Sequence, residues 1–97
     1  MLHTVNKSPF GNDTLESCLR FILPGDVLLL LEDGVYAAKE ATSKSNMIEK
    51  VLKNNEVFAL SADIKARGLN QLISGVQVTD YNGFVELVEK HKTHAWL

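Results

Sequence analysis

The six residues DVLLLL, at positions 26–31, decide the fold class of this chain. They form an apolar run after one aspartate, with Pro24 and Gly25 before it and Asp33 and Gly34 after it. A short, unbroken apolar run between turn residues is typical of a strand that is covered on both faces, as the strands of parallel sheets are. The run therefore predicts a central strand of a parallel sheet, and hence an α/β domain.

Similar signals alternate along the rest of the chain. We predict further strands at 2–5, 56–60 and 76–79, while the end of the chain, HAWL (94–97), forms either a short final strand or a docked tail. Apolar residues at helical spacing and turn residues predict helices over 13–22, 35–41, 46–53, 61–67 and 80–90. This alternation, with right-handed crossovers, predicts a three-layer α/β/α single domain over residues 1–97, with a mainly parallel sheet of about five strands.

Polar residues mark the ends of these helices. Asp13 and Asn46 each precede a glutamate by three positions, which is typical of a capping box, and Ser61 and Asp80 are suitable N-caps. Gly68 suits the left-handed position after a helix. The last helix carries apolar residues at 81, 84, 85 and 88, whose spacing predicts a single apolar face.

Composition excludes several classes of protein. The chain has 97 residues, of which 45% are hydrophobic and 23% are charged, as in ordinary globular domains. Ten basic residues are scattered among twelve acidic ones, which disfavours strong direct binding to nucleic acid. The apolar run in the first residues, MLHTVNK, is too short for a signal peptide, and no apolar run in the chain is long enough to span a membrane. We therefore expect a cytoplasmic protein.

The apolar residues at the end of the chain, Trp96 and Leu97, predict association with a partner, unless Trp96 packs onto its own domain.

The sequence contains little recognisable site chemistry. It lacks the glycine-rich phosphate-binding motifs, and we expect no cofactor and no metal. His91 and His94 have the spacing of two metal ligands on a helix, but solvated histidines are the favoured interpretation. His3 lies in an apolar strand, where a hydrogen-bonded structural histidine is favoured over a catalytic base. Lys65 with Arg67 could hold an anion, although a solvated helix face explains the pair more simply.

Two further features leave alternatives open. Glu32 and Asp33 are adjacent carboxylates at a strand end, where a turn is favoured over shared acid-base chemistry. Cys18 is the single cysteine, so it forms no disulfide within the chain. Its spacing puts it on the apolar stripe of the first helix, which favours a core residue over a reactive thiol, because a lowered thiol pKa requires exposure and positive neighbours.

Five segments in order resemble one family along the whole chain, namely LHTVNKSP (2–9), LLLLEDGVYAA (28–38), VFALSADIKARGL (57–69), DYNGFVELV (80–88) and AWL (95–97). Together they resemble the DsrH/TusB family. The resemblance implies a subunit of a cytoplasmic sulfurtransferase complex, a heterohexamer with two related small α/β subunits of the TusC and TusD or DsrF and DsrE types. Sulfur would move through it as a cysteine persulfide, for 2-thiolation of the tRNA wobble uridine, from TusA to TusE, or for intracellular sulfur oxidation with DsrC.

The resemblance also bears on the role of this chain. In the family the principal persulfide cysteine lies on the TusD or DsrE subunit, which implies a mainly structural subunit here, without catalysis of its own. Cys18 resembles a cysteine of DsrH chains that is a candidate second sulfur acceptor, which favours the DsrH side. Three functions therefore compete: an interface-forming subunit, a subunit in which Cys18 carries persulfide, and an unrelated small ligand-binding α/β module.

Overall fold

The fold alternates strands with helices from end to end. A computed structural model describes all residues, 1–97. In chain order the elements are β1 (Leu2–Val5), α1 (Thr14–Phe21), β2 (Val27–Leu30), the 3₁₀ helix η1 (Glu32–Ala38), α2 (Ser45–Val51), β3 (Glu56–Leu60), α3 (Ser61–Ala66), β4 (Gln77–Thr79), α4 (Tyr81–Lys90) and β5 (Thr93–Trp96). No helix is both long enough and apolar enough to cross a membrane.

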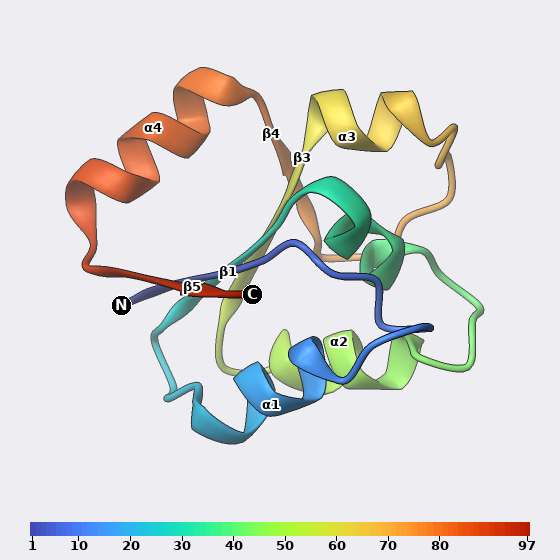
Figure 1. The fold of residues 1–97 in the computed structure, drawn as a ribbon, viewed down its shortest axis with the longest axis horizontal. Helices are drawn as coiled ribbons and strands as arrows, with labels where there is room; N and C mark the ends of the chain where they lie inside the picture. Colours follow the sequence, from blue (N-terminus) through green and yellow to red (C-terminus); the bar gives the residue numbers. More distant parts are fainter.

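The five strands form one sheet with the order β4-β3-β2-β1-β5, and every neighbouring pair is parallel. The predicted α/β class and parallel sheet are confirmed, and HAWL contributes an edge strand. The path from β1 to β4 moves across the sheet in one direction, and the connection from β4 to β5 returns in the opposite direction. Because parallel crossovers are right-handed, this return places α4 on the face opposite the other helices. Figure 1 shows α1 and α2 below the sheet and α4 above it.

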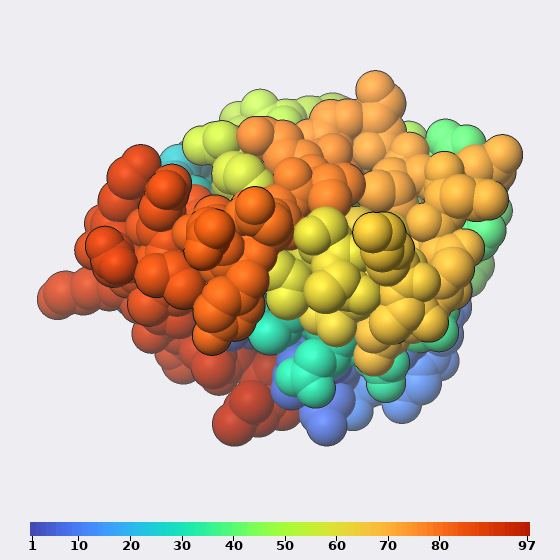
Figure 2. Space-filling view, turned by 90° about the horizontal axis from the view of Figure 1, so that it is seen from above, coloured from blue at the N-terminus to red at the C-terminus, as the bar shows by residue number.

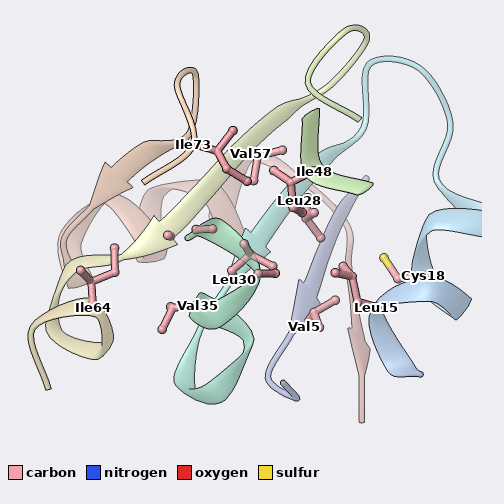
Figure 3. Packing of buried hydrophobic residues seen from close by; sticks show 13 residues of the cluster. Val5, Leu15, Cys18, Leu28, Leu30, Val35, Ile48, Val57, Ile64 and Ile73 are labelled. Carbon is pink, nitrogen blue, oxygen red and sulfur yellow. The ribbon is translucent and has the colours of Figure 1, made fainter. Parts of the chain in front are cut away.

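Two apolar clusters of unequal size follow from this arrangement. The larger lies beneath α1, η1, α2 and α3, and Figure 3 shows its side chains meeting between these helices and the strands. It includes Val5, Leu28 and Val57 from the central strands. The smaller cluster has Leu2 and Leu29 at its centre, and α4 is the only helix packed against it. In the space-filling view from above, α4 and α3, in orange and yellow, make up much of the visible surface (Figure 2).

The stripe of α4 that faces the sheet differs from the predicted one. Phe84 and Leu87 pack against the smaller cluster, whereas Tyr81, Val85 and Val88 are exposed. The predicted stripe was therefore correct at Phe84 and wrong at the other three positions. Leu87 faces the sheet in place of Tyr81, Val85 and Val88. The exposed three form an outward apolar stripe, which we call the α4 stripe.

The segment after β2 also differs from its prediction. A helix was predicted over 35–41, but η1 begins at Glu32 and ends at Ala38. The reason is a close approach at Gly34, where a Cβ atom would collide with the carbonyl oxygen of Val5. The chain therefore turns immediately after β2, and the Gly34 N–H donates to the carbonyl oxygen of Leu31 at 2.9 Å, a three-residue step typical of a 3₁₀ helix.

Of the predicted N-terminal caps, one is confirmed. Asp80 accepts from the N–H of Gly83 at 2.8 Å. Asp13 makes no side-chain cap bond, because Asn12 accepts from both the N–H and the hydroxyl of Thr14. The capping boxes predicted at Asp13 and Asn46 are therefore wrong. Helix α2 begins one residue before Asn46, at Ser45, and α3 has no side-chain cap bond from Ser61.

Candidate functional site

Cys18 is enclosed by the larger cluster. It lies on α1 with 0% of its surface exposed, and Figure 3 shows its sulfur beside Leu15, directed toward the strands. Burial raises the pKa of the Cys18 thiol to about 12, and the negative charge of Asp26 adds to this effect. The thiol is therefore protonated at neutral pH, and in this conformation it has no access to solvent. A persulfide could reach it only if α1 moved away from the sheet.

Asp26, the residue before β2, forms the centre of a polar network. Its Oδ2 accepts from His3 Nε2 at 3.0 Å and from the N–H of Leu23 at 3.1 Å, and its Oδ1 accepts from the Met1 ammonium at 3.2 Å. The hydrogen bond from His3 is the main cause that lowers the pKa of Asp26 to about 2. Asp26 is therefore a carboxylate at all physiological pH values.

His3 connects this carboxylate to the last strand. Its side chain is buried, and Nδ1 accepts from Trp96 Nε1 at 3.0 Å. Because an indole N–H can only donate, Nδ1 is unprotonated, and the proton of neutral His3 lies on Nε2, directed at Asp26. The expectation of a hydrogen-bonded structural histidine is confirmed. Trp96 folds back onto its own domain, so this residue gives no support to the predicted association, whereas Leu97 is 84% exposed.

A pocket of about 410 Å³ opens beside this network, on the α1 face of the sheet at β5. We call it the β5 pocket. The Trp96 ring stacks on Phe21 with 5.7 Å between centroids, and His94 lies 4.6 Å from Trp96. Seven residues line the pocket: Met1, His3, Phe21, Leu23, Asp26, His94 and Trp96. Aromatic walls around one carboxylate make this the most distinctive concavity of the molecule.

A second groove, of about 470 Å³, lies between α1 and α2. Its lining includes apolar residues, among them Leu19, Met47 and Val51, and the basic residues Arg20 and Lys50. Its charges are mixed, since Glu16 also lines it and pairs with Lys44 at 3.4 Å. No cysteine, serine, threonine or histidine lines the groove.

Charged residues near the carboxyl ends of the strands form ion pairs and hydrogen bonds with one another. Arg67 donates to Asp33 Oδ1 at 2.9 Å and contacts Asp63 at 3.5 Å, and its hydrogen bond to Asp33 raises the pKa of the guanidinium. The N–H of Glu32 donates to Asp63 at 2.7 Å. Glu32 and Asp33 therefore have different partners: the Glu32 N–H bonds to Asp63, and the Asp33 carboxylate bonds to Arg67. The structure also pairs Arg67 with two carboxylates at the surface, so Arg67 is not free to hold an anion with Lys65.

The two histidines with metal-ligand spacing lie on different elements. Helix α4 ends at Lys90, so His91 follows it and His94 lies in β5. They therefore do not share a helical face, and no group of three potential ligands surrounds them.

The Asp26 network was missed at the sequence level because its members are far apart in the chain. His3 and Trp96 are 93 positions apart, and only the return of the chain to β5 brings them together. One signal was available, since an aspartate directly before a buried strand needs polar partners. The sequence also did not reveal a second buried polar group, Asn6 Oδ1, which has no hydrogen-bond partner.

Comparison with known proteins gives a consistent result along the whole chain. The family model described as "DsrH like protein" matches residues 7–94. Protein TusB of Shigella flexneri is 41% identical, covering 99% of this chain and all of the relative. Protein TusB of Enterobacter sp. (strain 638) is 44% identical over 96% of each chain.

Two solved structures share the fold at lower sequence identity. The ychN protein from E. coli has a TM-score of 0.78 and 19% identity, covering 95% of this chain and 94% of that one. A protein of unknown function from Methanobacterium thermoautotrophicum has a TM-score of 0.75 and 16% identity, covering 97% and 95%. These two similarities establish the arrangement of strands and helices.

Proposed function

The chain belongs to the DsrH/TusB family, and from this premise we propose that it is a subunit of a sulfur-relay complex of the TusBCD or DsrEFH type. The observation that carries the proposal is the match to TusB proteins at 41% identity from end to end. In this proposal the partners are two related small α/β subunits, of the TusC and TusD or DsrF and DsrE types, in a heterohexamer. The complex works in the cytoplasm and exchanges sulfur with TusA and with TusE or DsrC.

We assign the chain a mainly structural role in this complex. The buried, protonated thiol of Cys18 supports this role, because sulfur transfer needs an accessible thiolate. Two exposed apolar surfaces also support it, namely the α4 stripe and the rim of the β5 pocket. Exposed apolar surface of this kind is typical of chains that associate with others.

The pathway that we favour is 2-thiolation of the wobble uridine in tRNA, because the relatives with high identity are TusB proteins. The direct test uses a bacterial strain that lacks its own TusB. Expression of this chain should restore 2-thiouridine in the tRNA, measured by mass spectrometry of digested nucleosides. Failure to restore it, although the chain forms a complex with the host's partner subunits, would contradict the assignment to this pathway.

Sulfur oxidation is the second candidate, and the cysteine in α1 is the observation that favours it. In that alternative the terminal sulfur of a partner's persulfide passes to Cys18, and the partner's cysteine leaves as a thiolate. Incubation of the assembled complex with a persulfide donor, followed by intact-mass analysis, tests this step. An added mass of one sulfur on the wild-type chain, absent from Cys18→Ala, would establish a carrier in place of a scaffold.

An unrelated ligand-binding module is the remaining alternative. Such a module should purify alone, whereas a subunit should purify with its partner chains when they are expressed together. Co-expression with a tag on this chain alone distinguishes these two outcomes. Isolation of the chain without partners would contradict the proposed function.

A further inference from the structure

The β5 pocket has the features of an anchor site at an interface. Its rim carries three of the nine exposed large apolar side chains of the molecule, since Met1, Phe21 and Leu23 are 50%, 68% and 66% exposed. Phe21 in particular stacks on Trp96 while most of its surface faces solvent. Large apolar side chains at the mouth of a concavity favour a partner that covers them.

The charge inside the pocket indicates the chemistry of its occupant. Asp26 is the only carboxylate among the lining residues, and the one cationic group paired with it is the ammonium of Met1, at 3.2 Å. Asp26 Oδ1 bonds only to the Met1 ammonium, in an exposed position, so one positively charged nitrogen already lies at this carboxylate. Trp96 and Phe21 present aromatic rings beside it, and such rings attract cations at short range.

The edge of the sheet provides a second contact next to the pocket. Strand β5 pairs only with β1, so the other side of its backbone has no strand partner. Thr93, His94 and Ala95 are exposed along this edge. An unpaired edge can receive an extended segment through main-chain hydrogen bonds, with a neighbouring pocket that selects one of its side chains.

We propose that the β5 pocket binds a lysine or arginine side chain of a partner subunit, carried by a segment that lies along the free edge of β5. This inference rests on the proposed function, because it takes the neighbour to be another subunit of the complex. The basic group takes the place of the Met1 ammonium at Asp26 Oδ1 and lies against Trp96 and Phe21. The segment covers the exposed rim.

The test uses the single tryptophan of the chain, which lies in the pocket wall. The chain is labelled with 5-fluorotryptophan and mixed with unlabelled, co-expressed partner subunits, and its one ¹⁹F resonance is followed by NMR. Filling of the pocket should shift this resonance when the complex forms. An unchanged resonance in an assembled complex would overturn the proposal while leaving the proposed function intact.

Two matched pairs of variants identify the contact. Phe21→Lys puts a competing cation at the pocket mouth, and Phe10→Lys makes the same change at another exposed phenylalanine outside the lining. We expect the first to weaken partner binding by roughly tenfold or more and the second to have little effect. Asp26→Asn should weaken binding similarly, whereas Asp13→Asn, on an exposed residue without side-chain hydrogen bonds, should not. Circular dichroism and urea unfolding check that each variant is folded.

The remaining outcomes also decide between explanations. Equal binding by Phe21→Lys and Phe10→Lys would contradict the pocket contact. A shift of the ¹⁹F resonance by micromolar spermidine in the isolated chain, with no shift on addition of the partners, would identify a free amine as the occupant and overturn the assignment to a subunit. If the wild-type chain binds no partner subunit at all, the proposed function fails, and this inference fails with it.

Discussion

The thiol of Cys18 should be nearly inert in the folded chain. Burial raises its pKa from 9.0 to about 12, so at pH 8 the fraction present as thiolate is about a thousandfold lower than in an unfolded chain. Because the thiolate is the reactive form, we expect iodoacetamide to modify the native chain at least about a thousandfold more slowly than the urea-unfolded chain. Burial of the sulfur slows the native reaction further.

The same shift makes the stability of the chain depend on pH in the alkaline range. The folded state retains the Cys18 proton up to about pH 12, whereas the unfolded state loses it above 9.0, so the folded state binds more protons in this window. Stability therefore falls as pH rises through it, by up to about 1.4 kcal/mol for each pH unit. Below pH 9 the contribution is fully present.

Comparison with Cys18→Ala isolates this effect from the lysines and tyrosines that titrate nearby. Loss of the buried sulfur should make the variant less stable at pH 8, by about 1 kcal/mol. The wild type should lose most of this advantage by about pH 10, since only it carries the thiol that must remain protonated. Urea unfolding at a series of pH values measures both curves. Rapid alkylation of the native chain at pH 8, or an advantage that grows with pH, would refute a buried thiol.

Three further predictions test other contacts. Gly34→Ala should lose more than about 2 kcal/mol in urea unfolding, because its Cβ would meet the backbone of Val5 and not a movable side chain. The stabilising effect of ionised Asp26, whose pKa is lowered to about 2, is present above 3.8 and is lost as pH falls, so the wild type and Asp26→Asn should converge in melting temperature between pH 4 and pH 2. Trp96→Phe should lower the unfolding free energy by roughly 1–3 kcal/mol in urea titrations, because it leaves the buried Nδ1 of His3 without a donor.

The features that the sequence predicts well depend on neighbouring residues. The apolar run at 26–31 and the segment at 56–60 both form strands at the predicted positions, because such runs have few other stable conformations in a chain of this size. Gly68 has φ +64° after α3, as the left-handed prediction requires. Asp80 caps α4 through a residue three positions away. Each of these features is determined within a few residues.

The features that the sequence does not reveal depend on where distant segments meet. The position of α4 follows from the return of the chain to β5, and this return also decides that Phe84 and Leu87 face the sheet. The start of η1 depends on the contact of Gly34 with β1. The pairing of Arg67 with Asp33 depends on the packing of α3 against η1. Periodicity along one segment contains none of this information.

The return of the chain to β5 also determines where the exposed apolar surfaces of the molecule lie. It places the α4 stripe on one face of the sheet and the β5 pocket on the other, so the two exposed apolar surfaces are separated by the body of the domain. A symmetric dimer needs one self-complementary surface, whereas a subunit between different neighbours needs two separate ones. The second arrangement matches this chain. Its buried cysteine and its two separate exposed surfaces therefore both support the proposed structural role.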